Sequence, residues 1–399
     1  MTIDIFERTK ALFDLPEGIV YLDGNSLGPL PKAARQRVLT EIDEGWGKSL
    51  IRGWNDRDWI GLQASTGDRI AKLIGAPAGS VIASDSTSIN LFKALTAALE
   101  SAGERKIVLS DSGNFPNDLY VAQGALAALD KFYVLKIVAP EEIADAITDE
   151  VAVLMITQVD YRTGRLHDME ALTAKARAKG VLTIWDLCHS AGALPVELER
   201  CGVDFAVGCG YKYLNGGPGA PAFIYVRPGL ADSVKPSLAG WMGHDAPFAF
   251  DLEYRPAKGI DRMRVGTPPI LSLAALHTAL EVWEGVDLHA LRARSIALCD
   301  RFIEEVERRC PDLELVTPRD AAMRGSQVSF RFHEGYAAMQ AVIAQGVIGD
   351  FRAPDMMRFG FTPLYIGIDD VLEAAGRLER VMREKLWDRP EYRNKNKVT

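Results

Sequence analysis

Short apolar runs rich in β-branched residues alternate with helix-period segments between about residues 65 and 230. Seven such runs occur, at 80–84 (SVIAS), 106–110 (KIVLS), 133–138 (YVLKIV), 151–157 (VAVLMIT), 181–185 (VLTIW), 205–209 (FAVGC) and 222–226 (AFIYV). Helical periodicity lies between several of them, at 89–99, 118–129, 141–147 and 169–179. Because apolar strands separated by helices are typical of a parallel sheet buried on both faces, the pattern predicts a mostly parallel, seven-stranded α/β sheet.

The segments on either side of this region have a different pattern of apolar positions. The N-terminal flank contains a short helix, a strand-like segment at 19–23 and a helix predicted from about Pro31 to Trp46. The C-terminal flank contains helical patterns at 271–284 and 287–310, short strands near 326–332 and 356–361, and a final helix at about 370–387. We therefore expect an arm (1–64) that belongs partly to a small domain, a large domain (65–270), and a smaller C-terminal α+β domain (271–399).

Composition narrows the class of protein. Of the 399 residues, 48% are hydrophobic and 25% are charged, which excludes a wholly disordered or collagen-like chain. The 46 basic and 54 acidic residues give a net charge of −8. Because no basic stripe stands out, we expect neither a nucleic-acid partner nor binding to an anionic membrane. No stretch approaches the ~18 uninterrupted apolar residues that a membrane span needs.

The cysteines and the N-terminus bear on the compartment. The five cysteines are scattered and form no C-x-x-C pair, so the sequence indicates neither a disulfide framework nor a metal site. The first residues, MTIDIFERTK, are acidic where a signal peptide needs a basic start and an apolar run. We therefore expect a cytoplasmic protein.

Polar side chains gather where the predicted strands end. In open α/β sheets, ligands bind beyond the carboxyl ends of the strands. Those ends carry an acid, a lysine, a tyrosine, a histidine, hydroxyl groups and an aromatic ring: Thr87, Ser88, Phe115, Thr157, Asp186, His189, Tyr211 and Lys212. Lys212 lies in an aromatic, glycine-rich segment, GCGYKYLNGGPGAP, where a solvated surface lysine is less expected.

This combination suits pyridoxal phosphate. The cofactor's aldehyde needs a lysine amine, and its ring nitrogen needs a carboxylate that keeps it protonated. Its phosphate suits hydroxyl and backbone N–H groups at the N-terminus of a helix. Asp186 and Lys212 each follow a predicted strand, and they supply the carboxylate and the amine.

Several motifs resemble one family of pyridoxal-phosphate enzymes. DLCHSAG (186–192) and GYKYLNGGPG (210–219) look like the aspartate and lysine segments of fold-type-I enzymes, and specifically of the kynureninase family. Five further motifs resemble that family in its order: YLDGNSLGPLP (21–31), NFPND (114–118), GWMGH (240–244), RVGTPPILSL (264–273) and RFGFTPLY (358–365). The resemblance covers nearly the whole chain and implies the aspartate aminotransferase superfamily fold.

The resemblance also implies roles for individual residues. Lys212 would bind the cofactor aldehyde covalently and move protons at the substrate's α-carbon, with Asp186 paired to the ring nitrogen and Tyr211 in acid–base steps. Arg358 would bind the substrate's α-carboxylate through a bidentate pair. Further cofactor contacts would come from Thr87, Ser88, Phe115, Pro116, Asn117, Asp118, Thr157 and His189. Trp241 and Thr267 would reach the phosphate from the partner subunit of a homodimer, and Asn25, Ser26, Trp54 and Gly266 would face the substrate.

The reaction implied by the resemblance is hydrolysis of L-kynurenine to anthranilate and L-alanine, in tryptophan catabolism and pyridine nucleotide biosynthesis. Cleavage of the 3-hydroxylated substrate to 3-hydroxyanthranilate belongs to the same family. The ring-pocket positions are Trp54, Gly266 and Thr267, and Trp54 offers apolar contact where a hydroxyl partner would be needed. This favours unsubstituted kynurenine as the substrate.

Three other functions remain open on the sequence alone. Gly24-Asn25-Ser26-Leu27-Gly28 fits the G-x-S-x-G pattern of serine hydrolases, although only an arm precedes it. A cysteine desulfurase of the same fold needs a nucleophilic cysteine on a mobile loop, whereas Cys299 and Cys310 lie in or after a helical pattern. A cofactor-binding regulatory domain would be accompanied by a helix-turn-helix segment or a basic patch, and neither is evident.

Overall fold

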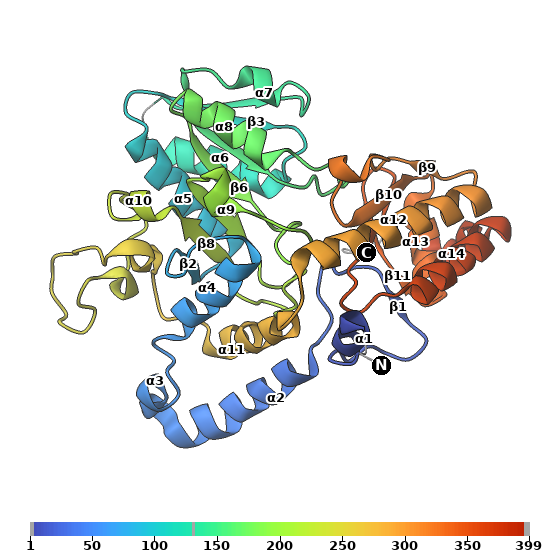
Figure 1. The fold of residues 1–399 in the computed structure, drawn as a ribbon, viewed down its shortest axis with the longest axis horizontal. Helices are drawn as coiled ribbons and strands as arrows, with labels where there is room; N and C mark the ends of the chain where they lie inside the picture. Colours follow the sequence, from blue (N-terminus) through green and yellow to red (C-terminus); the bar gives the residue numbers. More distant parts are fainter. Residues whose placement is uncertain (1–3, 130–131, 395–399) are drawn as a thin grey trace.

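In the computed structural model, residues 4–129 and 132–394 are described, and they form a large α/β part and a smaller C-terminal part (Figure 1). The large part is built on a seven-stranded sheet in the order β2-β8-β7-β6-β5-β3-β4. Only β8 runs antiparallel to its neighbours, which confirms the mostly parallel sheet. The strands are β2 (Val81–Ala83), β3 (Ile107–Asp111), β4 (Val134–Val138), β5 (Val151–Thr157), β6 (Leu182–Asp186), β7 (Phe205–Gly208) and β8 (Phe223–Val226).

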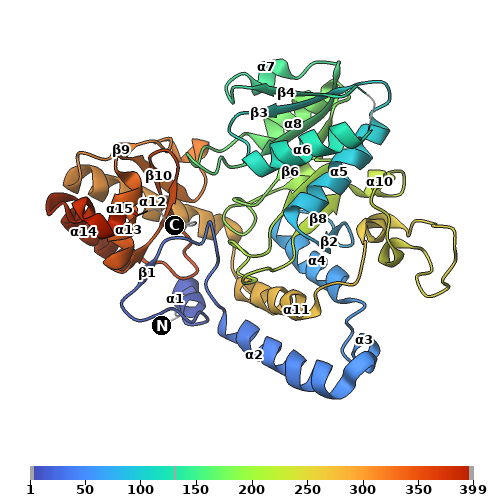
Figure 2. The same cartoon turned by 180° about the vertical axis from the view of Figure 1, so that it is seen from behind.

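The apolar runs form strands because both faces of the sheet are buried. Along β5, Val153 and Met155 join one hydrophobic cluster, whereas Leu154 and Ile156 join the other. Helices cover both faces, with α5 (Thr87–Ser101) and α6 (Pro116–Leu129) together across one of them (Figure 2). The other face is covered by α4 (Leu62–Leu73) and α8 (Met169–Ala178). Shorter helices complete this part: α7 (Ile143–Ala146), α9 (Leu198–Cys201) and α10 (Pro228–Ala231).

The C-terminal part is α+β, as the sequence predicts. Its antiparallel sheet has the order β12-β13-β10-β9. The predicted strands near 326–332 and 356–361 are β10 (Gln327–Arg331) and β13 (Met356–Gly360), and the predicted helices are α11 (Ile270–Ala279), α12 (Leu288–Arg309) and α14 (Ile368–Arg383). The sequence did not predict β9 (Glu314–Leu315), β11 (Val347–Ile348), β12 (Asp350–Arg352), α13 (Gly335–Ala344) or α15 (Pro390–Arg393). Strands of two or three residues are too short to show a period, and α13 is apolar on most of its faces.

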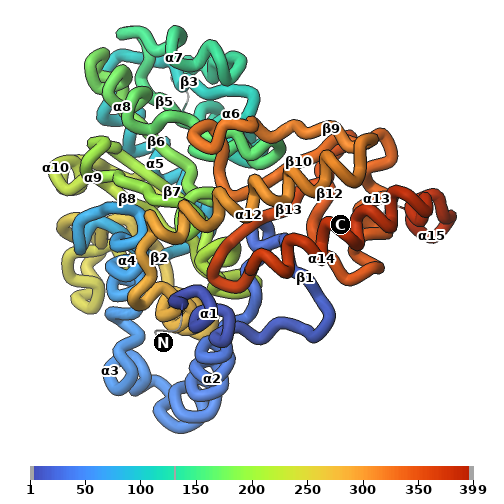
Figure 3. The backbone as a smooth tube through the Cα atoms, turned by 45° about the vertical axis from the view of Figure 1, so that its right-hand side comes forward, coloured from blue at the N-terminus to red at the C-terminus, as the bar shows by residue number. Residues whose placement is uncertain are grey.

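The N-terminal arm connects the two parts (Figure 3). After α1 (Ile5–Lys10), strand β1 (Val20–Tyr21) pairs with β11 of the C-terminal part. The chain then enters α2 (Lys32–Thr40), which packs against α11 and continues as a π-helical segment, Glu41–Ser49, before α3 (Gly53–Asp56). The arm therefore contacts the C-terminal part through β1 and then packs against α11 through α2. Within the described residues, no helix has the length and apolarity required to span a bilayer.

Candidate active site

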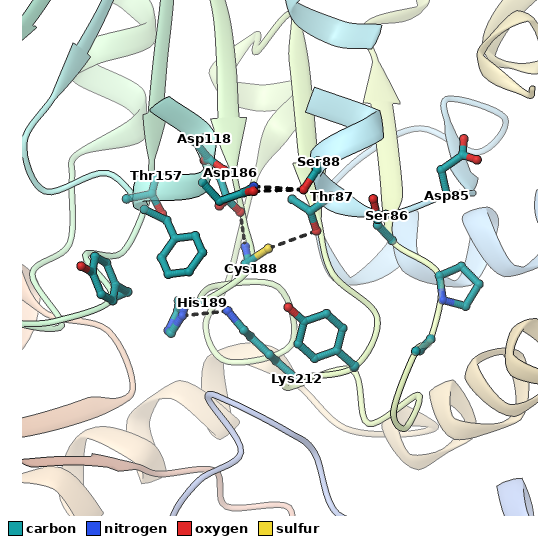
Figure 4. A pocket seen from close by; sticks show the side chains of 18 of the residues that line it. Asp85, Ser86, Thr87, Ser88, Asp118, Thr157, Asp186, Cys188, His189 and Lys212 are labelled. Carbon is teal, nitrogen blue, oxygen red and sulfur yellow. Dashed lines mark hydrogen bonds between the residues drawn. The ribbon is translucent and has the colours of Figure 1, made fainter. Parts of the chain in front are cut away.

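The carboxyl ends of the parallel strands open into a cavity of about 710 Å³. Ten of the predicted site residues line it: Thr87, Ser88, Phe115, Asn117, Asp118, Thr157, Asp186, His189, Tyr211 and Lys212. Figure 4 shows the labelled side chains around one space, with Lys212 and His189 facing each other and Asp186 beside Asp118. The rule that ligands bind at these strand ends therefore located the cavity correctly.

Lys212 is held on a tight loop after β7. Its Nζ lies 3.0 Å from Nε2 of His189 and 5.8 Å from the centre of the Phe115 ring. The N–H of Gly28 in the arm donates to the carbonyl of Tyr211, and a Cβ at Gly28 would lie only 2.4 Å from the carbonyl oxygen of Lys212. Glycine is therefore required at position 28 for the arm to pack against the lysine loop.

His189 is neutral in this setting. Burial, followed by the charges of Lys212, Arg358 and Arg352, holds the pKa of His189 well below its ordinary value. A neutral imidazole can accept a hydrogen bond from the Lys212 amine through Nε2. Its buried Nδ1 has no hydrogen-bond partner among the residues that the structure describes.

Two carboxyl groups lie together at the far side of the cavity. Asp186 ends β6, and its Oδ1 accepts a hydrogen bond from the N–H of Cys188 at 2.7 Å. Asp118 lies beside it in α6, and neither of its buried carboxyl oxygens has a partner within the described part of the chain. Burial, and then the charge of Asp186, raises the pKa of Asp118 well above its ordinary value. A buried carboxyl pair in which Asp118 has no partner among the described residues indicates a place for a ligand that donates a hydrogen bond or carries positive charge.

Hydroxyl groups cluster at the N-terminus of α5. Ser86 caps this helix, and Thr87 and Ser88 form its first turn. The Nδ2 of Asn117 donates to Oγ of Ser88 at 3.1 Å, which links the starts of α5 and α6. Free N–H groups and hydroxyls at the start of a 15-residue helix suit an anion such as a phosphate.

The residues present fit pyridoxal phosphate. A lysine amine, two buried carboxyl groups of which Asp118 has no partner in the described part of the chain, an aromatic ring and a helix N-terminus with hydroxyls line one cavity. These are the groups that the aldehyde, the ring nitrogen, the ring face and the phosphate of the cofactor require. Among the described residues, no group of His, Cys, Asp or Glu side chains could hold a metal ion.

The structure adds lining residues that the sequence did not assign to the site. Asp85, Ser86 and Cys188 line the cavity directly after β2 and β6, so their positions at strand ends were available as a signal. Tyr161 packs edge-on against the Phe115 ring with 5.0 Å between the ring centres. Tyr161 lies beyond β5 in an irregular segment that no pattern marked. Residues 218–222 and 269 also lie outside regular elements, and the patterns that contain them did not assign them to the site.

Arg358, predicted to bind the substrate's carboxylate, is not among the residues that line this cavity, and its guanidinium pairs with the carboxylate of Asp350. Its Nε donates to Asp350 Oδ1 at 2.6 Å, and its Nη2 donates to the other oxygen of the same carboxylate. Despite burial, which opposes ionisation, the hydrogen bond from Arg358 lowers the pKa of Asp350. The predicted substrate residue Ser26 joins this group, whereas Asn25 is fully buried against Gly360. Because the Ser26 hydroxyl pairs with Asp350 and the arginines, nothing supports its action as a hydrolase nucleophile.

Asp23 lies close to Asp350, and its raised pKa predicts that the stability of the protein depends on pH. Burial, and then the charge of Asp350, raises the pKa of Asp23 from 3.8 to about 7. A raised carboxyl pKa favours the protonated native state, so this stabilisation is present below about pH 4 and is lost as pH rises to about 7. The free energy of unfolding of Asp23→Asn, relative to wild type, should therefore increase by up to about 4 kcal/mol over that interval. Urea unfolding of both proteins across the interval measures this difference, and a constant difference would contradict it.

The remaining predicted residues lie outside the cavity formed by their own chain. Trp54 lies in α3 and packs edge-on against Trp59, with 6.1 Å between the ring centres. Trp241 is 40% exposed, Thr267 is exposed, and a Cβ at Gly266 would meet open space. Pro116 begins α6 without lining the cavity. A single chain therefore does not assemble these residues with Lys212.

Comparison with solved structures identifies the fold. The apo cysteine desulfurase from Thermococcus onnurineus NA1 superposes with a TM-score of 0.79 over 96% of this chain and 99% of that one, at 18% identity. A C-DES variant solved with glycine covalently linked to its PLP cofactor superposes with a TM-score of 0.74 over 91% and 97%, at 17% identity. At these identities the likeness shows the fold alone, which is that of the fold-type-I enzymes. Cys299 and Cys310, the cysteines weighed for desulfurase chemistry, are buried in α12 and at its end.

Comparison by sequence identifies the family. A family model described as the kynureninase C-terminal domain matches residues 291–378. The kynureninase of Pseudomonas fluorescens is 50% identical over 99% of this chain and 97% of its own length. The kynureninase of Burkholderia pseudomallei strain 1106a is 48% identical over 97% and 95%. With half of its residues shared over nearly its whole length, the chain belongs to the kynureninase family.

Proposed function

We propose that this enzyme uses pyridoxal phosphate to hydrolyse L-kynurenine to anthranilate and L-alanine. The observation that carries the proposal is the position of Lys212 and Asp186 on one cavity, in a chain that is 50% identical to a kynureninase. Bound pyridoxal phosphate supplies an electron-withdrawing ring that stabilises negative charge at the substrate's α-carbon.

The residues around that ring would each do one task. Lys212 would hold the cofactor through Nζ and move the proton at the α-carbon, with the neutral His189 imidazole orienting its amine. Asp186 would keep positive charge at the ring nitrogen, and Phe115 would contact the ring. Thr87 and Ser88 would bind the phosphate at the start of α5, where Asn117 donates to the Ser88 hydroxyl.

Tyr211 is the proposed proton relay. Burial raises the pKa of its phenol, so the hydroxyl keeps its proton at neutral pH. A protonated hydroxyl that lines the cavity can donate to the carbon leaving group after water has added to the aryl ketone. This role is consistent with its place next to Lys212 on the same loop.

A homodimer would bring the remaining residues to the site. Two segments with exposed apolar side chains support this proposal. One is the projecting loop that follows α10 (Figure 1), which carries Trp241, Phe248 and Phe250, and the other is the helical segment 41–52, which carries Trp46 and Ile51. Trp241 and Thr267 would then contact the phosphate of the partner subunit. Light scattering should give twice the mass of one chain, and Phe250→Asp should weaken the association because it places a charge in the interface. A monomeric wild type would contradict this proposal.

The proposed domain organisation is an arm (1–64), a large domain (65–270) and a C-terminal domain (271–399). Pairing of β1 with β11 supports an arm that belongs partly to the small domain. The packing of α11 against α2 and α4 is consistent with a C-terminal region that begins on the surface of the large part.

The ring pocket predicts a preference between two substrates. At the predicted pocket positions, Trp54 supplies apolar contact where a 3-hydroxyl group would need a polar partner. The enzyme should therefore have a higher kcat/KM for L-kynurenine than for 3-hydroxy-L-kynurenine. Steady-state assays with both substrates measure the ratio, and a clear preference for the hydroxylated substrate would refute it.

The direct test of the proposed reaction is product formation. Purified holoenzyme mixed with L-kynurenine should develop anthranilate fluorescence and release an equal amount of L-alanine. Alanine formed without anthranilate, or no product at all, would show that the proposal is wrong.

A further inference from the structure

Lys93 is a fully buried lysine bonded to the turn at the start of α5. It lies about two turns into that helix, and its side chain is 0% exposed. Its Nζ donates to Asp85 Oδ2 at 2.7 Å and to the carbonyl of Met263 at 2.6 Å. Burial lowers the pKa of Lys93, and the charge of Asp85 opposes this shift. Because an isolated buried ammonium is costly, these two acceptors account for its position.

Asp85 is an acid in a place that otherwise suits an anion. It lines the same cavity as Thr87 and Ser88 (Figure 4), and its side chain is 27% exposed. Its backbone is left-handed, with a φ of 50°, a conformation that Asp and Asn adopt more readily than most residues. The Oγ of Ser84 donates to the same carboxylate oxygen at 2.8 Å. A carboxylate beside a phosphate site would repel the phosphate unless its charge is balanced, and Lys93 is the cation bonded to it.

The second bond of Lys93 reaches the segment that carries two further predicted phosphate contacts. Met263 ends a short 3₁₀ helix, and Thr267 follows it closely in sequence. The carbonyl of Val265, between them, accepts a hydrogen bond at 3.2 Å from the N–H of the residue after Trp241. One buried amine therefore joins the phosphate turn of its own chain to the segment proposed to reach the phosphate of the partner subunit.

We propose that Lys93 is a positioning residue for the cofactor phosphate, because it holds Asp85 in place and balances its charge at the start of α5. This inference rests on the proposed function, since it takes pyridoxal phosphate as the ligand of that turn. Lys93 does not touch the phosphate in this role but acts through Asp85 and through the carbonyl of Met263. Thr87 and Ser88 remain the residues that would contact the phosphate.

The test compares two ligands that differ only in the phosphate group. The full chain, freed of cofactor by dialysis, is titrated with pyridoxal phosphate and with pyridoxal, and absorbance gives both dissociation constants. Lys93→Met approximately keeps the length of the side chain and removes its charge. The variant should bind pyridoxal phosphate roughly ten- to a hundredfold more weakly, as expected when a charged hydrogen bond is lost and an acid is left unbalanced. Its binding of pyridoxal should not change.

Further variants separate charge balance from packing. Lys93→Met combined with Asp85→Asn removes both charges, and its affinity for pyridoxal phosphate should return most of the way to the wild-type value. Asp85→Asn alone, which keeps the lysine and does not depend on the folding of Lys93→Met, should bind pyridoxal phosphate at least as tightly as wild type. Thr96→Val is the matched control, since Thr96 is 1% exposed and its hydroxyl donates to carbonyls of the same helix. This control should bind both ligands as wild type does.

Three results would overturn the inference. Unchanged binding of pyridoxal phosphate by Lys93→Met would show that the phosphate turn does not need this lysine. Equal weakening of both ligands would mean that Lys93 only supports the local structure. Weaker binding of pyridoxal phosphate by Asp85→Asn would show that the acid does not need its charge balanced. A wild-type protein that binds pyridoxal phosphate but forms no anthranilate would instead contradict the proposed reaction and leave this inference intact.

Discussion

Replacing Lys212 with alanine is expected to abolish the formation of anthranilate from L-kynurenine. The variant lacks the amine that we propose holds the cofactor and moves the proton at the α-carbon. Since acid–base catalysis alone contributes about 10²- to 10⁴-fold, kcat/KM should fall by at least about 10³-fold. Fluorescence assays at saturating pyridoxal phosphate measure the loss.

Two controls separate this effect from general damage. Lys235→Ala removes an exposed lysine in the same large part of the molecule and should leave activity unchanged. Lys212→Arg keeps a positive charge near His189 but cannot bind an aldehyde in the same way, so it should remain inactive. A Lys212→Ala variant that retains a substantial part of the wild-type activity would disprove the role of this amine.

Replacing Asp186 with asparagine is expected to give the second-largest loss. The amide oxygen can still accept the hydrogen bond from the N–H of Cys188, so the loop after β6 should keep its structure. The negative charge that balances the ring nitrogen is lost, and removal of one preorganised electrostatic group typically costs about 10²- to 10³-fold in kcat. Steady-state kinetics on the cofactor-saturated variant test this value.

Asp204 provides the matched control for Asp186. It is also buried, and it binds the N–H of Thr183 and the side chain of Arg227 at the amino ends of β6 and β7, opposite to the cavity. Asp204→Asn should lower thermal stability without a comparable loss of kcat. If the two variants had equal kcat values, the proposed role of Asp186 would fail.

Much of the large part could be predicted because each strand is a continuous apolar run. Every position of Val151–Thr157 is buried, and its side chains pack alternately on the two faces of the sheet. A continuous apolar run of this length therefore predicts a buried strand with little ambiguity. Asp186, His189 and Lys212 follow such runs directly, which is why their convergence could be expected. These parts of the site depend on local sequence and on one general rule of sheet topology.

The partners of Arg358 could not be predicted in the same way. Asp350 lies on a three-residue strand with no periodic signal, and its contact with Arg358 depends on the antiparallel register of β12 and β13. Ser26 joins them from the arm, more than 300 residues away in sequence. Tyr161 contacts the cavity from an irregular segment. Such long-range contacts arise from packing rather than from a pattern along the chain.

The central claim is that the amine of Lys212 is covalently bound to pyridoxal phosphate, and chemical trapping tests it most directly. Borohydride reduction of the purified holoenzyme fixes the cofactor to its lysine, and mass spectrometry of the peptides identifies that residue. We expect the label on the peptide that contains Lys212, with loss of the visible absorption band of the wild type in Lys212→Ala. A label on a different lysine, or a protein that takes up no cofactor, would contradict the account.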